Sequence, residues 1–345
     1  MGPGCDHAEV AALRDALRRS GRTAEGWIDH WGRDARQVCA GATLYVTLEP
    51  CCVWGRTPPC TEAVLAAGFA RVVVGAIDPS PAVNGKGVQL LRDAGIEVDL
   101  ASGELAHQIK RQNDGMRKFA ATGLPFVTYK YAMTLDGRVA ADGGDSRWVS
   151  SPESRRLVHL LRAWSDAVVV GAGTAIKDDP QLTAREVPCR RQPLRVVVSK
   201  YLSIAGETAL VRTVSEGPVL VVCGRGVSAE KRRQVESWGV ETVAVDEDDS
   251  GGLDPRAVLT ELGSRGVRYV LLEGGPRLAG AWWRADCIDK VVAFVSAKVV
   301  GGLECRSPLA GAGVTSMAEA RPLQEVCVER SGPDVLISGY TREPY

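Results

Sequence analysis

The first third of the chain alternates between two hydrophobic periodicities. Residues 9–19 have apolar side chains at helical spacing, so a helix is expected to begin at the His7-Ala8-Glu9 sequence. Apolar and β-branched runs predict strands at 43–48, 71–77 and 96–100, with helices at 61–67 and just ahead of Gly95. This alternation is typical of an α/β domain with a mainly parallel sheet. The almost continuous apolar run at 71–77 predicts a strand covered on both faces.

A second α/β pattern follows a predicted helical connector at 102–122. The connector ends at Gly123-Leu124-Pro125, which predicts two domains, residues 1–123 and residues 124–345. In the second domain, strands are expected at 126–131, 166–170, 194–198, 219–222, 242–245 and 269–272, and helices at 152–164, 229–238 and 255–262. The acidic, glycine-containing segment 246–252 is expected to be a solvated turn.

Composition is ordinary for a globular protein. Of the 345 residues, 45% are hydrophobic and 24% are charged, and 42 basic residues balance 42 acidic ones. The sequence has no basic stripe for nucleic acid, no apolar run near the ~20 residues of a membrane span and no signal peptide, so we expect a cytoplasmic protein. Ten cysteines in such a chain favour reduced thiols and one metal site over disulfides. Seven are expected to be packing residues: Cys5, Cys39, Cys189, Cys223, Cys287, Cys305 and Cys327.

Three residues form a candidate metal site. His7, Cys51 and Cys60 offer one imidazole and two thiolates, a donor set that suits Zn²⁺ and leaves a fourth position for water. Glu9 lies two residues after the histidine, as the proton-shuttling glutamate does in zinc deaminases. The spacing alone is also compatible with chance, since an isolated cysteine is most often a small buried hydrophobe.

Two glycine-containing turns are candidate phosphate sites. Residues 273–276 (EGGP) and 171–174 (GAGT) each follow a predicted buried strand. Glycines between a strand and a helix let a phosphate approach backbone N–H groups at the positive end of the helix. Neither turn has the dinucleotide fingerprint G-x-G-x-x-G, and a plain turn is an equally good interpretation of each.

The first half resembles the deaminase half of the bifunctional deaminase/reductase family of riboflavin biosynthesis. The resemblance rests on ATLYVTLEPC (42–51), GRTPPC (55–60) and DP (78–79). In that family the long spacing between the two cysteines is the rule. The resemblance implies that His7, Cys51 and Cys60 hold zinc and that Glu9 is the proton donor.

The chain departs from the family pattern at three places. Val53 stands where the family has a histidine beside the substrate, and segment 21–39, with Trp27, Ile28, His30 and Trp31, looks like an insertion. The family also has a helix and two strands, with an Asn-Pro turn, before the His-Ala-Glu sequence. We therefore expect a deaminase domain that is short at its start, or one that has lost its activity.

The second half resembles the reductase half of the same family. The matching segments are KYAMTLDGR (130–138), SRW (146–148), LRA (161–163), GT (173–174), DDPQLTAR (178–185) and EGGP (273–276). The resemblance implies a fold similar to dihydrofolate reductase and the use of NADPH. By the same resemblance, NADPH contacts Ala132, Trp148, Thr174, Asp178 and Gly275. Substrate would contact Ser146, Arg162, Leu182, Arg185 and Glu273.

The residue types suit this chemistry. Arg162 and Arg185 could bind a ribosyl phosphate bidentately, and Lys130 could place a proton or a charge near the sugar oxygen. Taken singly, Arg162 could instead be a solvated ion-pair residue and Trp148 a core residue.

We therefore predict a two-domain enzyme that deaminates a diaminopyrimidine ribosyl phosphate at zinc and reduces its ribosyl chain to ribityl with NADPH. A homo-oligomer, dimer or tetramer, is expected, without nucleic-acid or membrane partners. The main alternative is a reductase that keeps a vestigial or structural zinc module. A zinc-stabilised nucleotide-binding scaffold without catalysis is a further alternative, and a nucleic-acid deaminase comes last because no basic or aromatic track is visible.

Overall fold

The structure is a computed structural model that describes residues 6–26, 28–302 and 306–345. The chain divides into two compact units, residues 1–122 with 344–345, and residues 123–343. Cys5, Trp27 and Cys305 lie outside the described residues. No helix in the described ranges combines the length and apolarity that crossing a membrane would require.

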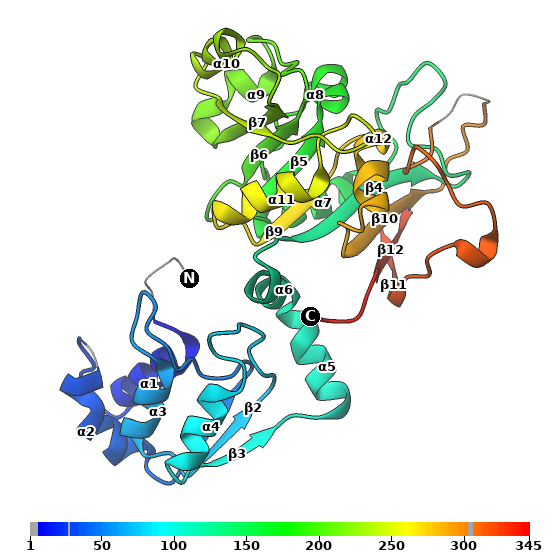
Figure 1. Ribbon diagram of the computed structural model, residues 1–345. Helices are drawn as coiled ribbons and strands as arrows, with labels where there is room; N and C mark the ends of the chain where they lie inside the picture. The colour runs from blue at the N-terminus through cyan, green and yellow to red at the C-terminus, as the bar shows by residue number, and fades with distance from the viewer. Residues whose placement is uncertain (1–5, 27, 303–305) are drawn as a thin grey trace. The chain divides into compact units, whose positions relative to one another are not determined.

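The first unit is built on a parallel sheet that has three strands within the described residues, in the order β1-β2-β3 (Figure 1). Its elements are α1 (Ala8–Arg19), α2 (Ile28–Cys39), β1 (Thr43–Val46), α3 (Cys60–Ala67), β2 (Arg71–Val74), α4 (Lys86–Asp93), β3 (Glu97–Leu100), α5 (Gly103–Gln112) and α6 (Asp114–Thr122). The predicted alternation of helices and strands is confirmed. Gly68 ends α3 in the left-handed region, at φ 68°, where glycine is favoured.

The structure refines three expectations for this unit. Burial along β2 alternates, with Val72 and Val74 fully buried and Val73 half-buried, so the strand is fully covered on one face rather than two. The connector at 102–122 is helical as predicted, and it is divided into two helices because the chain leaves helical geometry at Asn113. Most of segment 21–39 forms α2, whose Trp31, Ala35 and Cys39 pack into the core that α1, α3 and the sheet share. The extra segment is therefore an integral part of this unit.

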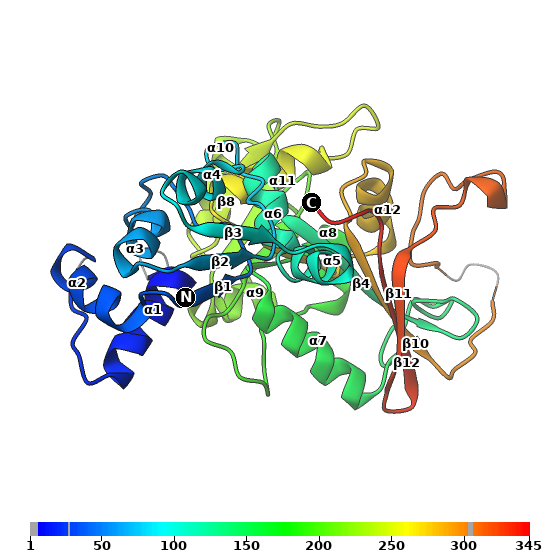
Figure 2. The ribbon, with the colours of Figure 1, turned by 90° about the horizontal axis from the view of Figure 1, so that it is seen from below.

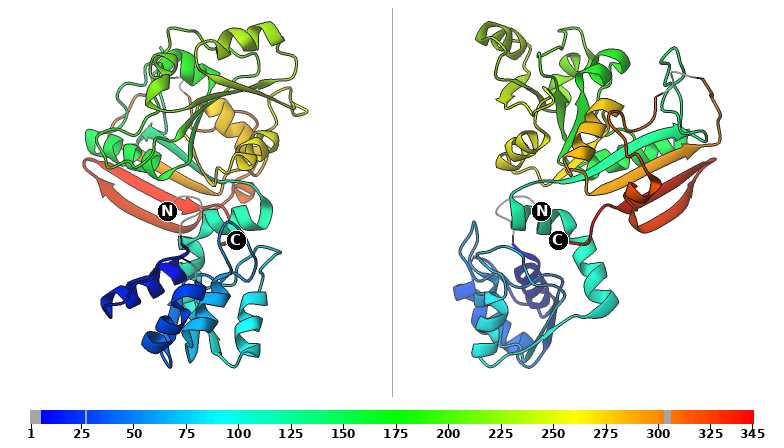
Figure 3. Two further views of the ribbon diagram at one scale, coloured as in Figure 1. Left: turned by 90° about the vertical axis from the view of Figure 1, so that its left-hand side faces the viewer. Right: turned by 45° about the vertical axis from the view of Figure 1, so that its right-hand side comes forward.

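The second unit is a sheet of nine strands among the described residues, in the order β11-β12-β10-β4-β9-β5-β6-β7-β8. Strands β10 and β12 pair antiparallel, as do β11 and β12, and every other pair is parallel. The strands are β4 (Phe126–Thr134), β5 (Ala167–Gly171), β6 (Leu194–Val198), β7 (Val219–Gly224), β8 (Glu241–Val245), β9 (Tyr269–Leu272), β10 (Lys290–Ser296), β11 (Gln324–Ser331) and β12 (Asp334–Tyr340). Figures 2 and 3 show the hairpin β11–β12, in red, at one end of this sheet.

Helices cover both faces of this larger sheet. They are α7 (Pro152–Trp164), α8 (Ala172–Asp178), α9 (Ala209–Arg212), α10 (Ala229–Glu236), α11 (Pro255–Ser264) and α12 (Pro276–Arg284), with 3₁₀ turns η1 (Val214–Glu216) and η2 (Met317–Glu319). One core cluster joins α11 and α12 to one face, and another joins α8, α9 and α10 to the opposite face. The predicted helices and strands are confirmed, and α8 and α12 begin at the two glycine turns, each of which was expected to lie between a strand and a helix. The short helix α9 and the strands β10 to β12 were not predicted.

Cysteine packing follows the expectation in part. Cys39, Cys223 and Cys287 are buried, whereas Cys189 is half-buried. Cys327 is exposed on β11, so its assignment as a packing residue is wrong.

Candidate functional site

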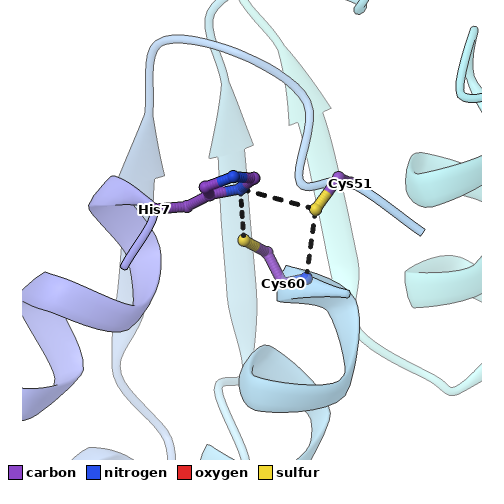
Figure 4. A group of neighbouring side chains, drawn as sticks. All are labelled: His7, Cys51 and Cys60. Atoms are coloured by element: carbon purple, nitrogen blue, oxygen red, sulfur yellow. Dashed lines mark hydrogen bonds between the residues drawn. The ribbon is translucent and has the colours of Figure 1, made fainter. Parts of the chain in front are cut away.

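Three candidate ligands come together at the starts of two helices in the first unit. His7 is the N-cap residue of α1, Cys60 is the first residue of α3, and Cys51 lies in the loop after β1 (Figure 4). The His7 Nδ1 atom lies 3.6 Å from Cys51 Sγ and 3.3 Å from Cys60 Sγ. The ligand atoms of the three residues all lie within 4.8 Å of one another. The convergence predicted from the sequence is confirmed, and the chance interpretation is wrong.

The two sulfur atoms share a proton-dependent contact. The hydrogen bond from the Cys60 thiol lowers the pKa of Cys51 to about 6, although burial works against it, and the Cys60 backbone N–H and His7 add to the lowering. The same contact raises the pKa of Cys60, together with burial and the carboxylate of Glu9. Cys51 therefore loses its proton readily while Cys60 keeps its own. Binding of a divalent cation would displace the proton of Cys60 as well.

Glu9 lies beside these ligands without being one of them. It occupies the first turn of α1, its side chain is buried, and its carboxylate hydrogen-bonds to Cys60. A nitrogen and two sulfurs with an adjacent carboxylate fit a zinc ion with one open position. Val53, at the position of the expected histidine, is exposed in the loop between Cys51 and Cys60.

The second unit contains an open cleft of about 1420 Å³. The cleft lies at the carboxyl ends of β5 and β9, where ligands bind in open parallel sheets. Every residue predicted to contact cofactor or substrate in the reductase half lines it: Lys130, Ala132, Ser146, Trp148, Arg162, Thr174, Asp178, Leu182, Arg185, Glu273 and Gly275. Among the described lining residues, eleven Lys or Arg side chains face four Asp or Glu side chains, so the cleft favours anions.

The two glycine turns meet at the floor of the cleft. A Cβ atom on Gly274 would lie 2.7 Å from both Gly171 N and Val170 Cα, which is closer than packed atoms allow. The Gly275 N–H donates to Thr174 Oγ1 at 3.0 Å, which ties the start of α12 to α8. Glycine is thus required here by the close approach of two backbones, and these are not plain solvent turns.

A buried ion pair lies at the centre of the cleft. Arg162 donates from Nε to Glu273 Oε1 at 2.6 Å and from Nη2 to Oε2 at 2.8 Å, and its Nη1 donates to Thr183 O at 3.1 Å. The Arg162 side chain is 12% exposed, so the solvated interpretation of this residue is wrong. Burial raises the pKa of Glu273, but the charge and hydrogen bonds of Arg162, together with the charges of Lys130 and His159, keep that pKa below its usual value.

Lys130 and Trp148 differ sharply in exposure. Burial lowers the pKa of Lys130, with Glu273 opposing the shift and Arg162 adding to it. Trp148 is 62% exposed, and the Arg155 guanidinium lies 4.5 Å from the centre of its ring. The core interpretation of Trp148 is therefore wrong, and its exposed ring is available to a flat ligand.

Sequence reasoning missed two residues near these sites. His159 lines the cleft one turn before Arg162 on α7, and its Nδ1 lies 3.2 Å from both Thr183 O and Arg185 N. The spacing of three residues between two polar side chains of one helix was the available signal.

Glu49 is buried in the first unit just before Pro50-Cys51, and its polar character gave no signal of burial.

Two family comparisons cover most of the chain. Residues 2–76 match the family described as the cytidine and deoxycytidylate deaminase zinc-binding region, and residues 125–337 match the RibD C-terminal domain. The riboflavin biosynthesis protein RibD of Aquifex aeolicus is 36% identical over 335 residues, which cover 97% of this chain and 85% of that protein. The chain belongs to the RibD family. It is therefore a riboflavin biosynthesis enzyme with a zinc-binding deaminase domain and a reductase domain.

Other relatives agree with this assignment. The RibD protein of Escherichia coli is 34% identical over 345 residues, covering 96% of this chain and 85% of that protein. Among solved structures, RibD of Acinetobacter baumannii (form 1) is similar with a TM-score of 0.78 and 32% identity over 98% of this chain and 86% of that one. The Thermotoga maritima diaminohydroxyphosphoribosylaminopyrimidine deaminase/5-amino-6-(5-phosphoribosylamino)uracil reductase has a TM-score of 0.76 and 32% identity, covering 98% of this chain and 85% of that chain.

Proposed function

We propose that this chain carries out both reactions named for its Thermotoga relative, the deamination of the diaminopyrimidine ribosyl phosphate and the reduction of its ribosyl chain. We also propose that NADPH supplies the hydride for the second reaction. The observation that carries the proposal is the convergence of His7, Cys51 and Cys60 beside Glu9. A vestigial module would have no need to keep a buried carboxylate next to an open coordination position.

In the deaminase half, the chain supplies ligands and a proton carrier. A zinc ion held by His7, Cys51 and Cys60 would supply a Lewis acid that makes water a nucleophile near neutral pH. Glu9 is close enough to Cys60 to take a proton from the attacking water and deliver it to the departing amino group. Its burial keeps bulk water from competing for that proton.

In the reductase half, the cleft would bind two anionic ligands side by side. NADPH supplies the hydride, and we assign its contacts to Ala132, Trp148, Thr174, Asp178 and Gly275, which all line the cleft. The excess of basic side chains suits the phosphates of both ligands.

For the substrate of this half, we assign contacts to Ser146, Arg162, Leu182, Arg185 and Glu273. Arg162 is already paired with Glu273, so Arg185, whose side chain is exposed, is the better candidate for the substrate phosphate. Lys130 would supply the proton or the positive charge at the sugar oxygen.

A reductase with a purely structural zinc site is the second candidate. The observation that favours it is Val53, an apolar and exposed side chain where the family has a histidine beside the substrate. A missing hydrogen-bond donor would weaken pyrimidine binding without affecting the metal ligands.

The test measures both activities and the metal in one preparation. We expect about one zinc per chain, ammonia release from the diaminopyrimidine substrate, and NADPH oxidation with 5-amino-6-(5-phosphoribosylamino)uracil. Cys60→Ser should abolish zinc binding and ammonia release and leave NADPH oxidation unchanged. Zinc binding without ammonia release would select the structural alternative, and failure to oxidise NADPH would contradict the reductase half.

We also propose that the chain forms a homo-oligomer. The edge strand β11 exposes Val326 and Val328, and an exposed edge with apolar side chains is a common pairing surface. Light scattering checks this, since a monomeric mass at micromolar concentration would contradict it.

A further inference from the structure

Glu49 is a buried carboxylate that accepts hydrogen bonds from backbone N–H groups. It lies between the end of β1 and the ligand Cys51, and its side chain is 2% exposed. Its Oε2 accepts from Asp78 N at 3.2 Å and from Gly85 N at 2.8 Å, and its Oε1 accepts from Val88 N at 3.0 Å. Three N–H donors on one carboxylate form a rigid attachment, because each hydrogen bond to a charged group is strong.

The geometry of these donors explains how the charge is tolerated. Gly85 is the N-cap residue of α4 and Val88 lies in its first turn, so Glu49 occupies the positive end of that helix. Two of the N–H groups that have no partner within the helix at its start are thereby satisfied from the loop after β1. The carboxylate thus joins three segments: the loop at Asp78, the start of α4, and the residues leading to Cys51.

A second contact fixes the same region. A Cβ atom added to Gly87, in the first turn of α4, would lie 2.2 Å from the carbonyl oxygen of Pro50 and 3.1 Å from Glu49 Oε1. The backbone of α4 therefore rests directly on the residue before Cys51. From the other side, the Cys51 carbonyl accepts from Thr61 N at 3.2 Å, which attaches the Cys51 loop to α3.

From these contacts we infer that Glu49 is a positioning residue for the metal site. It sets where Cys51 Sγ lies relative to His7 and Cys60 by holding the Pro50–Cys51 backbone against α4. The inference rests on the zinc site of the proposed function. It does not involve any contact between Glu49 and the metal ligands themselves.

The chemistry of the side chain makes a sharp test possible. A carboxylate accepts at both oxygens, whereas glutamine has one accepting oxygen and an NH₂ group that would face a backbone donor. Glu49→Gln keeps the shape of the side chain but replaces one accepting oxygen with an NH₂ group, which cannot accept from a backbone N–H. Gly87→Ala leaves the charge intact and pushes the same backbones apart. Glu104→Gln, on an exposed glutamate in the first turn of α5, is the matched control.

The experiment measures zinc affinity by chelator competition in the full chain, together with the absorption spectrum of the Co²⁺-substituted protein, which reports thiolate geometry. Circular dichroism and thermal unfolding of each variant check that the first unit is folded, since NADPH oxidation reports on the second unit alone. Glu49→Gln and Gly87→Ala should each weaken zinc binding by roughly 10–100-fold, the usual range for residues that orient metal ligands. Both variants should also change the Co²⁺ spectrum. Glu104→Gln should match the wild type.

Three results can be told apart, and each is decisive. Wild-type zinc affinity and an unchanged Co²⁺ spectrum in Glu49→Gln would overturn the positioning role while leaving the proposed function intact. A wild-type chain that binds no zinc would overturn the deaminase proposal and this inference with it. A loss of stability with normal zinc affinity would mean that Glu49 is a structural residue only, which also contradicts the inference.

Discussion

The metal site and the reductase cleft are assembled in opposite ways. The metal site takes its ligands and Glu9 from two short stretches, each leading into the first turn of a helix. The predicted site residues of the cleft are up to 145 positions apart, from Lys130 to Gly275, and meet at the carboxyl ends of parallel strands. One site depends on where two loops lie, and the other depends on the register of a sheet.

This difference determines what each site tolerates. At the metal site a small displacement of one sulfur changes the coordination, so backbone contacts such as those of Glu49 control it. In the cleft the central charges are held by an ion pair, and removing one partner leaves the other buried alone. Substitutions near the metal site should therefore mainly change metal coordination, whereas substitutions in the cleft should mainly change stability.

The largest expected effect is on proton transfer in the deaminase. Glu9→Gln should lower the ammonia-releasing kcat by about 10²–10⁴-fold, because the proton carrier is lost while the ligands remain. Zinc content and NADPH oxidation should stay at wild-type levels. A deaminase rate within threefold of wild type would remove Glu9 from the mechanism.

The next effect is on the stability of the second unit. Arg162→Met should destabilise it by about 3–5 kcal/mol, because the carboxylate of Glu273, which is 9% exposed, is left without its partner. The double variant Arg162→Met/Glu273→Leu should recover much of that loss. Urea unfolding measures both. Equal losses in the single and double variants would show that the ion pair is not what holds the centre of the cleft.

A smaller effect is expected at the meeting of the two glycine turns. Gly274→Ala places a Cβ against Gly171 and Val170 and should separate the two strand-to-helix turns at a cost of about 1–3 kcal/mol. The KM for NADPH should rise about tenfold, while deamination stays unchanged. Gly226→Ala is the control, since no atom lies within 4 Å of a Cβ built there and the residue does not line the cleft.

The smallest predicted change is a shift in pH dependence. Burial lowers the pKa of Lys130, so its charged form is lost at a lower pH than that of an ordinary lysine. If the charge is needed, the reductase rate falls as pH rises through that lowered pKa. Lys130→Arg keeps the charge and should move this fall to higher pH. An identical profile in both proteins would assign the fall to another group.

Much of the fold could be predicted because its strands are apolar and its helices begin and end with clear signals. Ser151 caps α7 by accepting from the Ser154 N–H, and Pro152 follows it at the start of the helix. The α9 helix was missed because its 4 residues are too few for a periodic pattern. The helix α2 was missed because its segment was treated as an insertion, although Trp31, Ala35 and Cys39 lie four residues apart on one face.

Much of the two sites could also be predicted, and the exceptions have a physical cause. His7, Cys51 and Cys60 were identifiable because few residue types bind zinc. Glu49 and His159 act through backbone atoms of distant segments, and no local pattern marks such partners. The pairing of Arg162 with Glu273 was likewise invisible, since each residue was assigned to substrate separately.

The most direct test of the account is X-ray absorption at the zinc edge of the purified chain. We predict a first shell with two sulfur neighbours at about 2.3 Å and one imidazole nitrogen at about 2.0–2.1 Å, plus one further light atom. A shell without sulfur, or with four sulfurs, would contradict the site formed by His7, Cys51 and Cys60.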